Sequence, residues 1–229
     1  MQIDFQKREI QLKVVYYGPA LSGKTTNLVA IHRIAAPSSR GRLMTLDTKD
    51  DRTLFFDLLP MHFATDSGLS IAIKLFTVPG QVIHDATRRL VLQGADAVAF
   101  VADSQVAETQ ANKDSFLNLR KNLEENGLDI RTLPLVIQFN KRDLPGVRTD
   151  AELDLLAKRS REPIYKAVAT DGTGVVETFM GLIGLTWQRL DSWHDLQGKF
   201  QVRGEVLVES LWRQLGRGPA PAAEARWTP

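Results

Sequence analysis

Residues 18–25 read G-P-A-L-S-G-K-T and fit the pattern G-x-x-x-x-G-K-[ST]. A β-rich run, residues 12–17, precedes this segment, and Leu28, Ile31 and Ile34 follow it at helical spacing. A loop that surrounds a phosphate turns its backbone N–H groups inward, which requires glycine where φ is positive or space is short. The motif and its flanking elements therefore predict a phosphate-binding loop between a strand and a helix.

The side chains of this loop have predictable roles. In such loops the lysine reaches the β- and γ-phosphates, and the hydroxyl that follows it ligates Mg²⁺. We assign these roles to Lys24 and Thr25, and the helix that begins near Lys24 adds unpaired N–H groups. The alternative is a glycine-rich turn with a surface lysine, which the flanking strand and helix argue against. The predicted nucleotide contacts of this segment are Gly18, Leu21, Ser22, Gly23, Lys24, Thr25 and Thr26.

Strand-like runs alternate with helical periodicity along most of the chain. Strands are predicted at residues 12–17, 42–46, 71–78, 97–101, 135–139 and 164–168, and helices at 24–34, 108–125, 150–160 and 175–190. Strands separated by helices of this length imply right-handed crossovers and a parallel sheet. We therefore predict an α/β fold of three layers, with a mainly parallel central sheet flanked by helices. Each motif follows a predicted strand, at the sheet edge where such folds bind ligands.

A second motif, Asn140-Lys141-Arg142-Asp143, follows the buried run that ends at residue 139 and matches N-K-x-D. A carboxylate only accepts hydrogen bonds. Guanine offers it two adjacent donors and adenine offers no such pair, so Asp143 argues for GTP and against a P-loop ATPase or phosphotransferase. Lys141 is expected to lie over the base or to brace the phosphate loop. The alternative for this segment is a polar turn that caps the strand.

Two further segments complete the predicted site. Val168, Ala169 and Thr170 end the last predicted strand and resemble the short loop whose backbone N–H binds guanine O6. Residues 77–81 read T-V-P-G-Q where D-x-x-G-Q is expected. Gly80 can offer its N–H to the γ-phosphate, and Gln81 is placed to orient the attacking water. Thr77 replaces the aspartate that usually supports Mg²⁺.

Residues 47–60 pass from a charged run directly into an apolar run. Thr53 could be the switch threonine that binds Mg²⁺ only when the γ-phosphate is present, and Arg52 could act in cis as an arginine finger. Alternatively, Arg52 is a solvated surface charge and Thr53 is a helix N-cap. Spacing alone does not separate these interpretations.

Together these segments resemble the bacterial gliding-motility GTPases of the MglA family over residues 5–190. The resemblance rests on V-Y-Y-G-P at 15–19, L-S-G-K-T-T-N-L at 21–28, R-T-L-F-F-D at 52–57, T-V-P-G-Q at 77–81 and N-K-R-D-L-P at 140–145. It implies a Ras-like P-loop fold that binds GTP or GDP with Mg²⁺. It also implies that Arg52 is an intrinsic arginine finger, Thr53 the switch threonine and Gln81 the water-positioning residue. Thr77 agrees with the family pattern.

The same resemblance implies partners and a place in the cell. The activator would be a homodimeric roadblock-fold protein, MglB-like, that stimulates hydrolysis without donating its own arginine. Polarity or motility effectors would bind the switch face of the GTP form, which would cluster at a cell pole. A GTP-binding scaffold with negligible turnover is the alternative to a hydrolysing switch.

Composition excludes several other classes. The chain has no cysteine, which excludes disulfides and prenylation, and Met1-Gln2 lacks the glycine that myristoylation needs, so no lipid anchor is expected. A net charge of +2 gives no argument for nucleic acid. No signal peptide is recognisable, and the cytoplasm is the expected compartment.

The last part of the chain lies outside the resemblance. We expect residues 191–215 to form a helical C-terminal extension, because residues 204–215 carry apolar side chains at helical spacing. It either folds back on the domain or binds a partner. The Gly-, Pro- and Ala-rich residues 216–229 are expected to be disordered.

Overall fold

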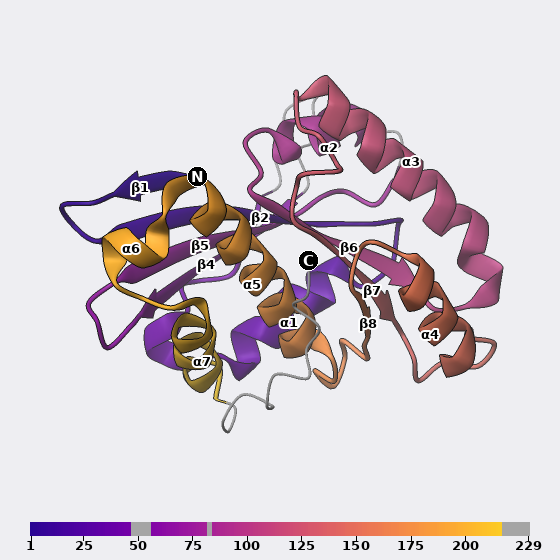
Figure 1. Ribbon diagram of the computed structural model, residues 1–229. Helices are drawn as coiled ribbons and strands as arrows, with labels where there is room; N and C mark the ends of the chain where they lie inside the picture. Colours follow the sequence, from indigo (N-terminus) through magenta and orange to yellow (C-terminus); the bar gives the residue numbers. More distant parts are fainter. Residues whose placement is uncertain (47–55, 82–83, 217–229) are drawn as a thin grey trace.

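The computed structural model describes residues 1–46, 56–81 and 84–216 of the chain. These residues form an eight-stranded sheet with helices packed against it (Figure 1). Its strands are β1 (Gln2–Asp4), β2 (Glu9–Tyr17), β3 (Met44–Leu46), β4 (Phe56–Ala64), β5 (Ser70–Thr77), β6 (Ala97–Asp103), β7 (Leu135–Asn140) and β8 (Ile164–Lys166). The order across the sheet is β3-β4-β5-β2-β6-β7-β8, with β1 paired to β2.

The centre of the sheet is parallel and its margin is antiparallel. Strand β2 pairs in parallel with β5 and β6, and β7 pairs in parallel with β6 and β8. The β1–β2, β3–β4 and β4–β5 pairs are antiparallel. The carboxyl ends of β2, β5, β6 and β7 therefore meet at one edge, where the phosphate loop and the N-K-x-D turn begin.

Helices cover both faces of the sheet. They are α1 (Lys24–Ile34), α2 (Asp85–Leu92), α3 (Thr109–Glu125), α4 (Asp150–Arg159), α5 (Val175–His194), α6 (Leu196–Phe200) and α7 (Gly204–Gln214), with short 3-10 turns η1 (Pro37–Ser39) and η3 (Val106–Glu108). One apolar core joins α1, α5, α6 and α7 to the sheet, and a second joins α2 and α3 to it. Within the described residues, none of these helices has the length and apolarity that crossing a membrane requires.

The predicted α/β fold is confirmed, and the phosphate-loop helix has the predicted bounds. Three of the strands and α-helices were not predicted, namely β1, β4 and α2, whereas α6 and α7 fall within the predicted helical extension. Strand β4 was missed because its sequence contains Pro60, which lacks an N–H for a sheet ladder. In the structure the Pro60 carbonyl accepts from the Gly41 N–H, on the side away from β5. The missing N–H therefore does not interrupt the β4–β5 ladder.

The C-terminal helices pack on the main core. Helix α5 continues to His194, four residues past its predicted end. Figure 1 shows α6 beside the β1–β2 hairpin, where the Phe200 ring stacks on Phe5 at 5.4 Å between centroids. Leu207 and Leu211 of α7 are buried in the α1–α5 core. Of the two alternatives for this extension, the structure favours folding back on the domain, and residues 217–229 of the tail lie outside the described residues.

Candidate functional site

The phosphate loop has a backbone that only small residues permit at two positions. Gly18 has φ 152° and Gly23 has φ 98°. A Cβ at Gly18 would collide with the carbonyl oxygen of Val101, and one at Gly23 would collide with the side-chain amide of Asn140. Leu21 also has a positive φ, 59°, and its side chain is exposed. The loop thus adopts the close-packed conformation that the motif predicted.

Lys24, the first residue of α1, is directed back into this loop. Its side chain is 6% exposed, and the Nζ donates to the carbonyl oxygens of Gly18 at 3.0 Å and Pro19 at 2.5 Å. The pKa of Lys24 is lowered to about 7, chiefly because burial penalises the charged form and in addition because the Arg88 charge is nearby, while Asp57 opposes the change. Within the described residues this buried ammonium bonds no anion directly, an arrangement that suits an anionic ligand.

This geometry predicts that nucleotide binding takes up protons. In the free protein Lys24 is mostly neutral at pH 8, because its pKa is about 7. Phosphate oxygens favour the charged form, so the pKa rises in the complex and binding weakens as pH increases from 7 to 10. Calorimetric titration of GDP at pH 8, in two buffers of different ionisation enthalpy, should show uptake of close to one proton. The variant Lys24→Arg is the control, since its guanidinium stays charged. Equal uptake by the variant, or none by the parent protein, would contradict the assignment.

Asn140 joins the base-binding turn to two other loops. Its side-chain amide donates to the carbonyl oxygen of Ser22 at 2.8 Å, and its Oδ1 accepts from the Ala169 N–H at 2.9 Å. Asn140 is buried, so these contacts are shielded from water. One side chain therefore holds the phosphate loop and residues 168–170 in a fixed relation to the N-K-x-D turn.

The other residues of this turn are held by nearby contacts or exposed. Lys141 has a positive φ of 65°, and its Nζ pairs with the Asp103 carboxylate at 2.6 Å. Asp143 is exposed. The N–H of Arg142 donates to the Ala167 carbonyl at 3.1 Å, which fixes the turn against the end of β8.

A buried amide pair behind the phosphate loop was not predicted. Asn27 on α1 donates to the Gly23 carbonyl at 2.9 Å and to Gln138 Oε1 at 2.8 Å. Gln138 on β7 returns a bond to Asn27 Oδ1 and bonds Thr178 on α5, both at 2.9 Å. The signal in the sequence was a glutamine inside the otherwise apolar run 135–139. This pair fixes the loop's last glycine to the sheet and to α5.

Pro79 and Gly80 are held in place from below by Arg88 of α2. This arginine is fully buried, and its guanidinium donates to the Pro79 carbonyl at 2.8 Å, to the Gly80 carbonyl, and to Asn118 Oδ1 at 2.7 Å. A Cβ at Gly80 would collide with the backbone of Ala20, so the segment lies directly against the phosphate loop. Sequence reasoning missed Arg88, because a fully buried arginine has no local signature.

Asp57 of β4 was also not predicted, and it contacts three threonines. Its Oδ2 accepts from the Thr25 hydroxyl at 2.6 Å and from the Thr77 hydroxyl at 2.8 Å, while Oδ1 accepts from Thr45 at 2.9 Å. The Asp57 N–H in turn donates to Thr77 Oγ1 at 2.9 Å. The signal in the sequence was a carboxylate that shares the buried face of an alternating run with Leu59.

Several of the predicted phosphate-binding and switch residues line an open hollow of about 580 Å³. Its lining includes Lys24, Thr25, Gly80, exposed Gln81 and Asp57. Arg52 and Thr53 lie outside the described residues. Hydroxyl and carboxylate oxygens are the ligands that Mg²⁺ prefers, and this ion commonly uses one or two carboxylates together with phosphates. The described residues contain no group of three His, Cys, Asp or Glu side chains that could hold a metal ion.

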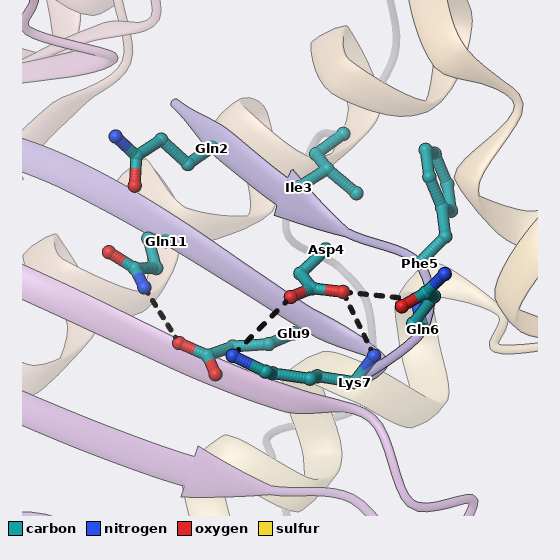
Figure 2. A pocket seen from close by; sticks show the side chains of 8 residues that line it. All are labelled: Gln2, Ile3, Asp4, Phe5, Gln6, Lys7, Glu9 and Gln11. Carbon is teal, nitrogen blue, oxygen red and sulfur yellow. Dashed lines mark hydrogen bonds and ion pairs between the residues drawn. The ribbon is translucent and has the colours of Figure 1, made fainter.

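A second hollow, at the β1–β2 hairpin, is lined mostly by polar side chains, together with Ile3 and Phe5 (Figure 2). The Asp4 carboxylate accepts from the N–H groups of Gln6 and Lys7, both at 3.0 Å, and Gln11 donates to Glu9 at 2.8 Å. These contacts are local to the hairpin. The hollow lies at the amino end of β2, about 25–30 Å from the phosphate loop at the other end of this strand.

Comparison with known proteins identifies the family of the chain. No family model matches the chain. The mutual gliding-motility protein MglA of Myxococcus xanthus (strain DK1622) is 47% identical over 188 residues, which cover 82% of this chain and 96% of that protein. Identity at this level over nearly the whole relative is far beyond what a shared fold alone produces. The chain therefore belongs to the MglA family of gliding-motility GTPases.

Proposed function

We propose that this chain is a small Ras-like GTPase that alternates between GDP- and GTP-bound states and controls motility or cell polarity through effectors of its GTP form. The observation that carries the proposal is the position of Asn140, which ties the guanine motif to the phosphate loop at 2.8 Å and to the Ala169 N–H at 2.9 Å. A strand-capping turn would not require contacts to both loops. Family membership supports the role in motility.

The residues divide the chemistry among themselves. Lys24 and the loop N–H groups would hold the β- and γ-phosphates, with Gly80 presenting its N–H to the γ-phosphate. Gln81 would orient the water that attacks the γ-phosphorus, and Arg52 would neutralise charge that develops on the transferred group. Asp143 would accept from guanine, and Thr25 and Thr53 would ligate Mg²⁺. When bound, this ion would stabilise the negative charge on the phosphate oxygens, including the charge that develops on the leaving oxygen.

The switch face is also where we place partners. A homodimeric roadblock-fold activator would bind there and order the catalytic side chains, and effectors would read the same face in the GTP form. We propose residues 5–190 as the GTPase domain and residues 191–215 as an extension that stabilises it. Leu211 of this extension is fully buried in the main core, which supports that role.

The test is GTP turnover by the purified protein, alone and with catalytic amounts of its roadblock-type partner. We expect slow hydrolysis alone and strong acceleration by the partner, with tight GDP and GTP binding in both cases. Binding without acceleration would favour a GTP-binding scaffold. Failure to bind guanine nucleotides at all would overturn the proposed function.

A further inference from the structure

Asp57 is a buried carboxylate whose hydrogen-bond partners among the described residues carry no positive charge. It is 6% exposed, and within the described part of the chain the side chains that donate to it are the hydroxyls of Thr25, Thr45 and Thr77. Hydroxyls satisfy the lone pairs of a carboxylate but leave its negative charge in place. A buried charge is costly unless a cation compensates it, so a carboxylate at this position needs an explanation.

The position of Asp57 relates it to the altered switch motif. Strands β4 and β5 are antiparallel, and Asp57 and Thr77 are the residues of these strands that come next beyond the paired Leu58 and Phe76. Thr77 stands where the switch pattern usually has an aspartate, and its hydroxyl donates to Asp57 Oδ2 at 2.8 Å. A carboxylate therefore lies beside the expected place, supplied by the neighbouring strand.

The Thr25 hydroxyl connects this carboxylate to the predicted cation site. Thr25 is the loop residue expected to ligate Mg²⁺, and it lies 2.6 Å from Asp57 Oδ2. Among the described residues that line the hollow of this site, Lys24 is the cation, and its Nζ donates to the carbonyls of Gly18 and Pro19 rather than to Asp57. Once Lys24 engages phosphates, the carboxylate requires another positive charge next to Thr25. A divalent cation held by oxygen ligands meets that requirement.

We propose that Asp57 supports Mg²⁺ in this site, as a positioning residue that takes the role the aspartate at position 77 has elsewhere. The inference rests on the proposed function, because the cation would enter together with the nucleotide. The competing explanation is that Asp57 only fixes β4 to its threonine neighbours. An asparagine could make most of those contacts but carries no charge. The variant Asp57→Asn therefore distinguishes the two explanations.

The experiment measures release of fluorescent GDP from Asp57→Asn and from the parent protein over a series of Mg²⁺ concentrations. We expect the variant to need about 10–100-fold more Mg²⁺ to slow release, as outer ligand partners typically contribute that much. Release in excess EDTA should be equal for both proteins. The control is Asp96→Asn, a carboxylate at the opposite edge of the sheet that accepts from the Lys13 N–H at 2.8 Å. It should keep the parent's Mg²⁺ dependence.

Moving the carboxylate from position 57 to position 77 distinguishes a lost Mg²⁺ response from a general loss of structure. Asp57→Thr alone should lose the Mg²⁺ response, and Asp57→Thr combined with Thr77→Asp should regain it. An unchanged Mg²⁺ dependence in Asp57→Asn would overturn the inference, as would a double variant that binds GDP as tightly as the parent in EDTA but does not respond to Mg²⁺. A parent protein that fails to bind GDP would instead refute the proposed function.

Discussion

Replacing Arg52 with alanine is expected to lower partner-stimulated GTP hydrolysis by about 10³–10⁵-fold, the usual contribution of an arginine finger. GTP binding should be retained, because the finger acts on charge that develops only as the γ-phosphoryl group is transferred. The described part of the site supports the need for such a residue. Lys24 is the one cation that lines the hollow within the described residues, and it would already contact the phosphates of bound GTP.

Arg88 does not replace Arg52 in this role. Its guanidinium is fully buried and donates to the carbonyls of Pro79 and Gly80 and to Asn118. Freeing it would break these contacts to Pro79 and Gly80. We infer that Arg52, which precedes β4 in the sequence, supplies the second cation.

The measurement is single-turnover hydrolysis of GTP with a roadblock-type partner. Arg131→Ala provides the matched control, because Arg131 is exposed and pairs locally with Asp129 at 2.9 Å. Acceleration of Arg52→Ala to the parent's rate would show that another group supplies the charge. If neither protein turns over GTP in the presence of bound partner, the scaffold alternative is favoured.

Asp143→Asn is expected to weaken GTP binding by about 10²–10⁴-fold. The carboxylate would accept two hydrogen bonds from guanine, and each bond to a charged group contributes about 1.5–3 kcal/mol. An asparagine side chain has one acceptor and one donor group. In either orientation its carbonyl accepts from one guanine donor while its amide NH₂ faces the other donor, so one of the two bonds is lost.

The same variant should gain affinity for xanthine nucleotides, since xanthine has a carbonyl oxygen where guanine has the amine. Competition titrations with GDP, ADP and xanthosine diphosphate measure all three affinities. Asp66→Asn, which changes an exposed carboxylate distant from the motifs, should leave them unchanged. Guanine preference that survives Asp143→Asn would refute the assignment of the base site.

The sequence predicted the parts of the site that depend on local backbone chemistry. Gly18, Gly23 and Lys24 lie where the motif places them, because their φ angles and the helix that follows are properties of one short segment. The location of Asn140 followed from a buried strand ending just before it. Parallel strands bring such ends together, which is why motifs far apart in the chain share one edge.

The residues that were missed depend on non-local contacts. Asp57 has a role only because β4 lies next to β5, and Pro60 concealed that strand. Gln138 and Asn27 are 111 residues apart, and neither predicts the other without the fold. Hydrophobic periodicity indicates that a polar residue faces the core, but it does not identify the residue that forms its hydrogen bond there.

The two bonds of Asn140 also bear on how long a nucleotide stays bound. Because one side chain fixes both the loop around the phosphates and the segment beside the base, neither end of the ligand site can loosen independently of the other. Dissociation of the nucleotide would then require the phosphate loop and residues 168–170 to move at the same time, which is less frequent than movement of one segment after the other. For the proposed nucleotide site we therefore expect slow intrinsic release.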